Sequence, residues 1–272
     1  MSSDNDTITL NNLSSKNSGP TITCIVDATH GARLSSIEVK NYELLVQPDS
    51  VDRSANPMSW GAYPMVPWAG RIRNGAFSHE GTPHQLRLNK APHAIHGTVF
   101  DKSWDVTSST SSSVTLVTDL GKHWPLGGSV EHRVSLRENI LECQLKVTAG
   151  RQSMPAQVGW HPWFVRPVTL TCAFSKMFVR DEHGIPAGET VSPTPPPWDD
   201  CFTAARTSPL LNFGNGTAIT MISDCEYWVV YDEPDHAICV EPQSGTPDAF
   251  NLAPQVIEPG QSLTRLMQLV IS

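Results

Sequence analysis

The stretch ILECQLKV, residues 140–147, carries the pattern that decides the fold. From Leu141 to Val147 the odd positions are apolar, and the polar residues Glu142, Gln144 and Lys146 lie between them. Successive side chains of a β-strand point to opposite faces, so this alternation predicts a strand with one buried face.

Runs of the same kind recur along the chain and are separated by Gly, Pro, Asn and Ser residues. They are TITCIVD (21–27), SIEVKNYELLVQ (36–47), SVTLVTDL (113–120), EYWVVYD (226–232) and HAICVE (236–241). No window shows the apolar spacing of an amphipathic helix, and 22 prolines with 18 glycines would interrupt most helices. The sequence therefore predicts an all-β fold, a large antiparallel β-sandwich with little helix.

One domain is expected over residues 1–272, because sandwiches of this length are commonly single units. The proline-rich passage SPTPPPWDD, residues 192–200, resembles a linker between domains. Similar strand patterns continue on both sides of it, so we interpret it as a stiff connection inside one sandwich.

The charge and composition exclude several classes of partner. A net charge of −8 without a Lys/Arg cluster argues against nucleic acid and against an anionic membrane surface. No apolar run reaches the roughly 20 residues that span a bilayer, and the polar, acidic start MSSDNDTITL is unlike a signal peptide. A cytoplasmic location is expected. The six cysteines form no C-x-x-C pair and are predicted to be buried thiols, without a disulfide or zinc framework.

Four passages combine ionisable groups with aromatic, Pro or Gly residues. They are PMVPWAGRIRNG (64–75), PHAIHG (92–97), VGWHPWF (158–164) and VEPQSGTPDAFN (240–251). This mixture is typical of a sugar site, where flat rings cover the apolar side of a pyranose and polar groups hold its hydroxyls.

The chemistry that these passages favour is proton transfer. His93 and His96 have a spacing that could chelate a metal, but there is no H-E-x-x-H, nearby cysteine pair or obvious third ligand, so no metal site is predicted. The nucleophile motif G-x-S-x-G and phosphate-binding glycine loops are also missing. His and Glu remain as general acid and base.

Each candidate also has a purely structural interpretation. His161, between Trp160 and Pro162, is typical of a satisfied core histidine, and Glu241 is typical of a carboxylate at the end of a strand. Arg71 and Arg73 would share one face of an extended segment, as ordinary surface charges do.

Taken together, five passages resemble the aldose 1-epimerase (galactose mutarotase-like) family, specifically its shorter bacterial-type members. PMVPWAGRIRNGAF, HAIHG, GWHPWF, DDCF and VEPQSGTPDAFN occur in the family's order over most of the chain. The resemblance implies a galactose mutarotase-like supersandwich with a sugar cleft on one sheet. It also implies an isomerase that interconverts the α and β anomers of an aldose without cofactor or metal, as a monomer or homodimer.

The resemblance also implies roles for single residues. Glu241 matches the catalytic base, His161 the acid at the ring oxygen and His96 the second active-site histidine. Arg71 matches the sugar-contacting arginine. Asp200 matches the aspartate that holds hydroxyls, and the adjacent Asp199 is the alternative match.

Two alternatives to a neutral hexose stay open. Hexose-6-phosphate epimerases of this superfamily resemble HGFAR-x-x-x-W, whereas this chain reads HGTVFDKSW with Phe100 at the arginine position. Arg87, Lys90 and Lys102 lie close enough in sequence to provide a phosphate site. The second alternative is a non-catalytic sugar-binding or regulatory sandwich, although binding alone requires no acid and base.

Overall fold

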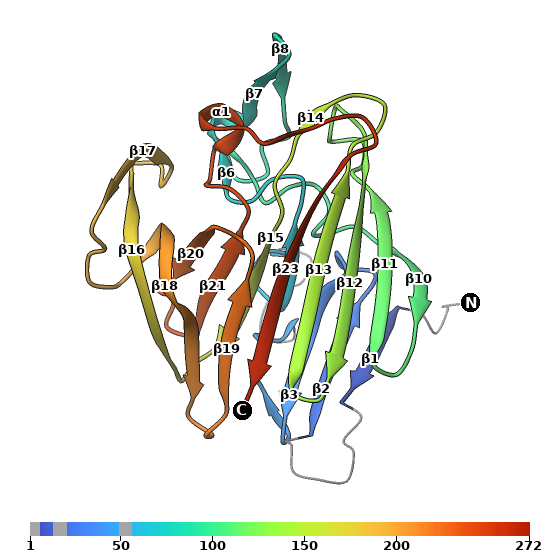
Figure 1. Ribbon diagram of the computed structural model, residues 1–272, viewed down its shortest axis with the longest axis vertical. Coiled ribbons are helices and arrows are strands. Elements are labelled where there is room, and N and C mark those ends of the chain that lie inside the picture. Colours follow the sequence, from blue (N-terminus) through green and yellow to red (C-terminus); the bar gives the residue numbers. More distant parts are fainter. Residues whose placement is uncertain (1–5, 13–20, 49–55) are drawn as a thin grey trace.

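The structure, a computed structural model, describes residues 6–12, 21–48 and 56–272. Residues 1–5 of the acidic start lie outside the described part. Figure 1 shows the elements, whose bounds in chain order are β1 Thr7–Asn11, β2 Ile22–Asp27, β3 Arg33–Val39, β4 Tyr42–Glu43, β5 Ala62–Met65, β6 Arg71–Ile72, a 3-10 helix Arg73–Gly75, β7 Ala76–His79, β8 Thr82–Gln85, β9 Ala94–Ile95, β10 Asp105–Ser109, β11 Ser113–Asp119, β12 Ser129–Arg137, β13 Ile140–Thr148, β14 Met154–Pro155, β15 Gly159–Val165, β16 Val168–Arg180, β17 Pro186–Val191, β18 Asp199–Phe213, β19 Ala218–Ser223, β20 Tyr227–Tyr231, β21 Ala237–Gln243, α1 Ala249–Leu252, β22 Val256–Ile257 and β23 Ser262–Ile271.

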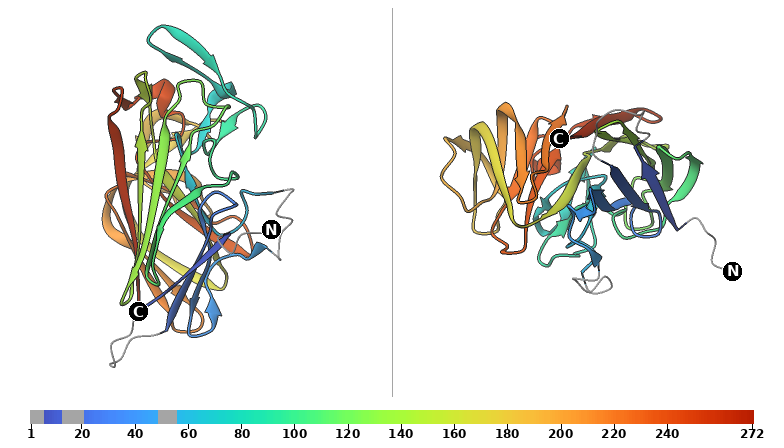
Figure 2. Two further views of the ribbon diagram at one scale, coloured as in Figure 1. Left: turned by 90° about the vertical axis from the view of Figure 1, so that its right-hand side faces the viewer. Right: turned by 90° about the horizontal axis from the view of Figure 1, so that it is seen from below.

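Seventeen strands of the described chain form one sheet, which has two arms. The first arm runs β1–β2–β3–β5–β15–β21–β20, and the second runs β10–β11–β12–β13–β23–β19, with antiparallel neighbours throughout. Both arms join the long strand β18, where Asp199–Thr203 pair with β20 and Leu210–Asn212 pair with β19. The arms face each other as two layers in the left view of Figure 2. The predicted large antiparallel β-sandwich is confirmed.

The main core lies between the two arms. The odd positions of β13, from Leu141 to Val147, are fully buried, as the alternation in ILECQLKV predicts. They pack in one cluster with first-arm residues such as Cys24 and Ile37. All six cysteines are free thiols, and five of them are buried.

One predicted strand is in fact a hairpin. The run SIEVKNYELLVQ breaks after Val39, because Lys40 and Asn41 adopt left-handed conformations with φ of 52° and 66°. Two consecutive positive φ values are typical of the tight turn that joins antiparallel strands. Residues 192–198 of the proline-rich passage connect β17 to β18 of the same sheet.

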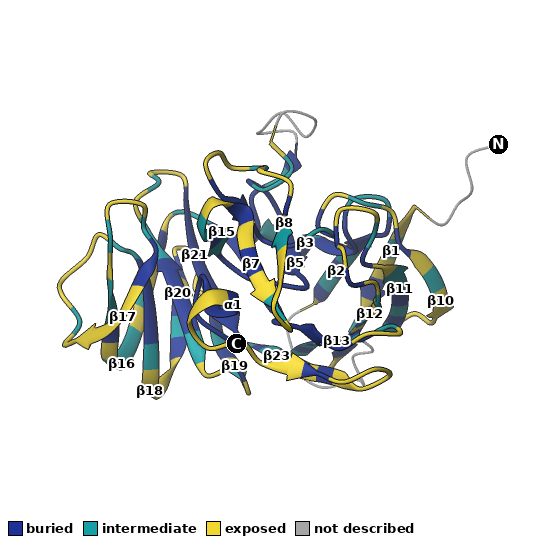
Figure 3. Ribbon diagram, turned by 90° about the horizontal axis from the view of Figure 1, so that it is seen from above, coloured by how far each residue is buried: buried dark blue, intermediate teal, exposed yellow. Residues whose placement is uncertain are grey.

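Strands β15 and β21 are buried on both faces, as the dark blue ribbons in Figure 3 show. Trp160 and Phe164 point into the main core, whereas Trp163 packs on the opposite face with Tyr63 and Cys239. This second buried face is where the candidate site lies. The described helices are short turns, and none could cross a membrane.

A buried histidine connects the two arms. His132 of β12 lies with its Nδ1 3.0 Å from the Ala32 carbonyl oxygen, and the Trp160 indole N–H donates to its Nε2 over 3.3 Å. These partners fit the neutral ring with its proton on Nδ1. Burial lowers the pKa of His132 to about 4.

We therefore predict an acid-sensitive stability that depends on His132. A histidine in the unfolded chain has a pKa of about 6.5. As the pH drops, the unfolded state therefore takes up a proton before the folded state does. The free energy of unfolding falls from about pH 6.5 towards pH 4. Between pH 7 and pH 5, the free energy of unfolding should fall by about 2 kcal/mol more in the natural protein than in His132→Gln. Urea unfolding at both pH values measures this, and equal losses in the two proteins would refute it.

Candidate active site

A cavity of about 300 Å³ opens on the second buried face of β15 and β21. Its walls come from segments far apart in the sequence, and they include all the residues that the family resemblance singles out. These are Arg71, His96, His161, Asp199, Asp200 and Glu241.

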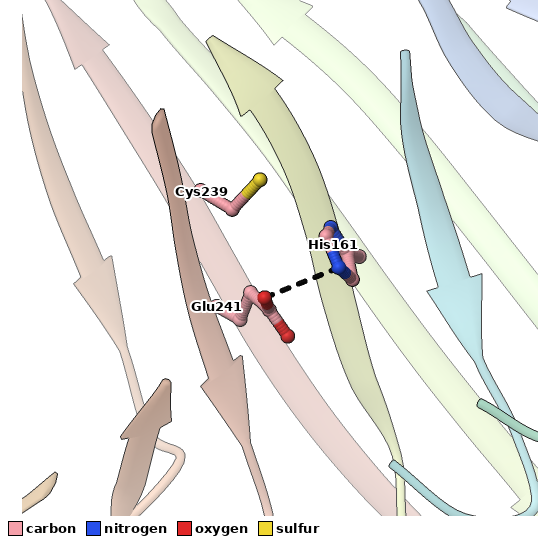
Figure 4. Close-up of side chains that lie close together, drawn as sticks. All are labelled: His161, Cys239 and Glu241. Carbon is pink, nitrogen blue, oxygen red and sulfur yellow. Dashed lines mark ion pairs between the residues drawn. The ribbon is translucent and has the colours of Figure 1, made fainter. Parts of the chain in front are cut away.

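An acid/base pair lies in this cavity. Strands β15 and β21 pair with Gly159 opposite Gln243 and Trp163 opposite Cys239, so the register brings His161 beside Glu241. The His161 Nε2 atom lies 3.2 Å from a Glu241 carboxylate oxygen, and both side chains are buried (Figure 4). The strand register therefore holds an imidazole and a carboxyl group side by side in the cavity.

Aromatic rings fix the orientation of His161. Its ring stacks on Tyr63, at a centroid distance of 4.9 Å, and on Trp163, at 5.3 Å. His96 meets the same ring edge-on at 5.0 Å. The sequence analysis did not single out Tyr63, which directly precedes the PMVPWAGRIRNG motif and lies opposite His161 on β5.

Gln243 orients the carboxylate. Its amide N–H donates to the second Glu241 oxygen over 3.1 Å, while its own Oε1 atom is buried without a hydrogen-bond partner among the described residues. The sequence analysis missed this residue. The signal that could have found it is its spacing from Glu241, because residues two apart on a strand point to the same face.

Burial favours the neutral forms of both members of the pair. It raises the pKa of Glu241 well above the usual range, and the nearby Asp199 carboxylate adds to this shift. Burial lowers the pKa of His161 to about 3, and the Arg33 guanidinium acts in the same direction. Both shifts favour a protonated Glu241 carboxyl group beside a neutral His161 ring.

His96 reaches the cavity from a strained turn. His96 and Gly97 have φ of 60° and 80°, and a Cβ atom at position 97 would lie 1.9 Å from the Val66 carbonyl oxygen, so only glycine fits there. The Gly70 N–H donates to His96 Nδ1 over 3.3 Å, which leaves Nε2 to carry a proton. His93 instead accepts a hydrogen bond from the Asn74 N–H and is not among the residues that line the cavity.

The two arginines of the GRIRNG segment serve different purposes. Strand β6 ends at Ile72, and the left-handed Asn74 turns the chain, so the expected extended segment is interrupted. Arg71 lines the cavity, whereas Arg73 forms an ion pair with Asp181 at 2.6 Å.

The strand register distinguishes the two aspartates. Asp199 lies opposite Tyr231, which lies opposite Cys239, so Asp199 shares its face of the sheet with Glu241. Asp200 lies opposite Val230 on the alternate face. Arg180 forms ion pairs with both carboxylates, at 3.1 Å from Asp200 and 3.4 Å from Asp199. Both residues border the cavity, but only Asp199 is among the charges that raise the pKa of Glu241.

Comparisons with known proteins identify the family and the fold. The sequence profile of the family "Aldose 1-epimerase" matches residues 19–269. The uncharacterized protein YihR of Escherichia coli (strain K12) is 24% identical over 82% of this chain and 81% of its own length.

Two crystal structures share the fold. A galactose mutarotase-like protein from Clostridium acetobutylicum has a TM-score of 0.83 at 16% identity, covering 99% of each chain. The galactose 1-epimerase from Lactobacillus acidophilus NCFM has a TM-score of 0.79 at 16% identity, covering 98% of each chain. Because the profile spans nearly the whole chain, this protein belongs to the aldose 1-epimerase family.

Proposed function

We propose that this protein is an aldose 1-epimerase that interconverts the α and β anomers of a neutral hexose. The observation that supports it most is the 3.2 Å contact between His161 and Glu241 inside a cavity. The anomeric and ring oxygens of an aldose are both bonded to C1. An acid and a base that serve them must therefore converge on one point, as these two side chains do.

The proposed reaction is a pair of proton transfers. Glu241, as the carboxylate, takes the proton of the C1 hydroxyl while the imidazolium of His161 protonates the ring oxygen, so the C1–O5 bond breaks and an aldehyde forms. Rotation about C1–C2 presents the other carbonyl face, and the reverse transfers close the opposite anomer. Neither step needs a redox cofactor or a nucleophile.

The pair reaches its reactive state without taking up a proton from outside. Moving the shared proton from the Glu241 carboxyl to His161 creates the carboxylate and the imidazolium while the total charge stays the same. The Arg71 guanidinium lowers the pKa of Glu241 and so favours this transfer. Burial opposes it, because both products are charged.

Other residues would hold the sugar. His96, whose Nε2 is left to donate, would stabilise the oxygen on which charge develops. Arg71 and Asp199 lie on the cavity wall near Glu241 and would bind hydroxyls. Among the two aspartates, the register supports Asp199 for this role.

One observation supports a hexose phosphate as the second candidate substrate. Of the three cations considered for a phosphate, only Lys90 borders the cavity. Lys102 is instead bound to Asp119 at 2.6 Å, and Arg87 lines a separate cavity. Phe100 is buried beside Tyr63 and supplies no charge, so the neutral hexose remains the first proposal.

Removing the acid or the base should nearly abolish catalysis. We expect Glu241→Gln and His161→Asn each to slow mutarotation by about 10²- to 10⁴-fold, the usual contribution of one positioned acid or base. Polarimetry on freshly dissolved α-glucose and α-galactose measures the rate, and circular dichroism checks that the variants are folded. Folded variants with natural rates would reject the assignment. Sugar binding by the natural protein without any acceleration would instead favour a non-catalytic binding protein.

Matched substitutions can separate the two aspartates. Asp199→Asn should raise the KM for hexose by about tenfold, the effect of losing one charge-assisted hydrogen bond. Asp200→Asn should change KM less, because the register places Asp200 on the face of the sheet opposite to that of Glu241. Steady-state kinetics on one sugar compares them. A larger effect at Asp200 would show that the register argument is wrong.

The two substrate candidates differ in their dependence on Lys90. We expect faster turnover of glucose than of glucose 6-phosphate, and Lys90→Ala should leave the glucose rate within about twofold. A coupled assay follows the phosphorylated sugar. A preference for glucose 6-phosphate that falls by about tenfold or more in Lys90→Ala, as loss of a hydrogen bond to a charged group would cause, would contradict the neutral-hexose proposal.

A further inference from the structure

A third buried side chain joins the acid/base pair. The ligand atoms of His161, Cys239 and Glu241 all lie within 4.8 Å of one another, and all three residues are buried. Figure 4 shows the Cys239 sulfur on the side of its strand that faces His161. These atoms are an imidazole nitrogen, a thiol sulfur and a carboxylate oxygen, which are the three donor types that zinc takes in proteins.

We infer that this triad is a binding site for Zn²⁺ and chemically similar divalent ions, and that metal binding there inhibits the protein. Zinc holds its ligands at roughly 2.0–2.3 Å in a tetrahedron, which places neighbouring donor atoms about 3.5 Å apart. The His161–Glu241 separation of 3.2 Å already fits, and the remaining separations are within 4.8 Å. Small side-chain movements would complete a three-ligand site.

The surroundings suit a metal ion of this type. Gln243 donates to one Glu241 oxygen and so orients the carboxylate, as hydrogen bonds around metal ligands commonly do. Tyr63 and Trp163 stack on the His161 ring and fix its plane. Binding replaces the thiol proton of Cys239 with a metal–sulfur bond and also displaces the proton of the Glu241 carboxyl group, and both protons pass to solvent.

Three protein ligands leave the fourth position of a tetrahedron open. His161 and Glu241 border the cavity, so water or a sugar hydroxyl would fill that position. The site differs from the His93/His96 pair that the sequence suggested as possible chelators. It combines two residues of β21 with one residue of β15 through the strand register.

Inhibition follows from shared atoms. A bound ion takes the His161 nitrogen and a Glu241 oxygen, so neither group can exchange protons with a sugar. This consequence rests on the proposed epimerase function, whereas metal binding itself does not. Sugar and metal should compete, and a chelator should restore the rate.

The binding test uses Co²⁺ as a spectroscopic substitute for Zn²⁺. A titration of the purified, reduced protein with Co²⁺ should produce a near-ultraviolet thiolate-to-cobalt charge-transfer band, and added Zn²⁺ should remove it. Cys239→Ala should lose the band. Cys201→Ala is the matched control, because Cys201 is also buried and borders the cavity but lies outside the triad, and it should keep the band.

The inhibition test measures mutarotation against Zn²⁺ concentration, relative to each variant's own metal-free rate. Cys239→Ala should raise the half-inhibitory Zn²⁺ concentration by at least about 10- to 100-fold. Mutating a residue that only hydrogen-bonds to a metal ligand already lowers metal affinity by this factor. Absence of a band in the natural protein, or a band retained in Cys239→Ala, would overturn the site. A band that depends on Cys239 together with unchanged or increased activity would overturn the inhibitory role.

A protein that binds metal but has no epimerase activity would count against the proposed function alone.

Discussion

One buried contact holds the candidate site together, the 3.2 Å approach of His161 Nε2 to a Glu241 carboxylate oxygen. Burying an imidazole and a carboxyl group as charged ions costs desolvation free energy. Such a pair is therefore stable only where hydrogen bonds and packing against neighbouring rings fix both side chains. Here burial shifts the pKa of each group toward its neutral form, which limits this cost. Gln243 on one side and Tyr63 with Trp163 on the other supply the support.

The sandwich explains why this pair lies where it does. Strands β15 and β21 bury one face against the opposite arm, and their other face forms the floor of the cavity. Because successive side chains of a strand point to opposite faces, Trp160 packs in the core while His161 lines the cavity. The same fold that makes the core therefore sets the distance between acid and base, and the Trp160 indole links this strand to His132 of the other arm.

Much of the architecture could be predicted from the sequence, because period-two alternation is a local signal. Leu141 and its neighbours have the burial that the pattern predicts. The hairpin at Lys40–Asn41 was not predicted, since two left-handed residues without glycine give a weak turn signal. The predicted site residues line one cavity. Their prediction, however, came from the order of the motifs and from the family resemblance, not from a local pattern. Contacts that depend on strand register, such as Cys239 beside His161 and the different faces of Asp199 and Asp200, join distant segments and have no local signature.

The most direct test of the central claim is a crystal structure of the Glu241→Gln variant with a bound hexose. The account predicts that the reducing end of the sugar lies in the cavity, with His161 Nε2 within hydrogen-bond distance of the ring oxygen and the side chain at position 241 facing the C1 hydroxyl. A sugar bound with C1 directed away from both side chains, or outside this cavity, would contradict it.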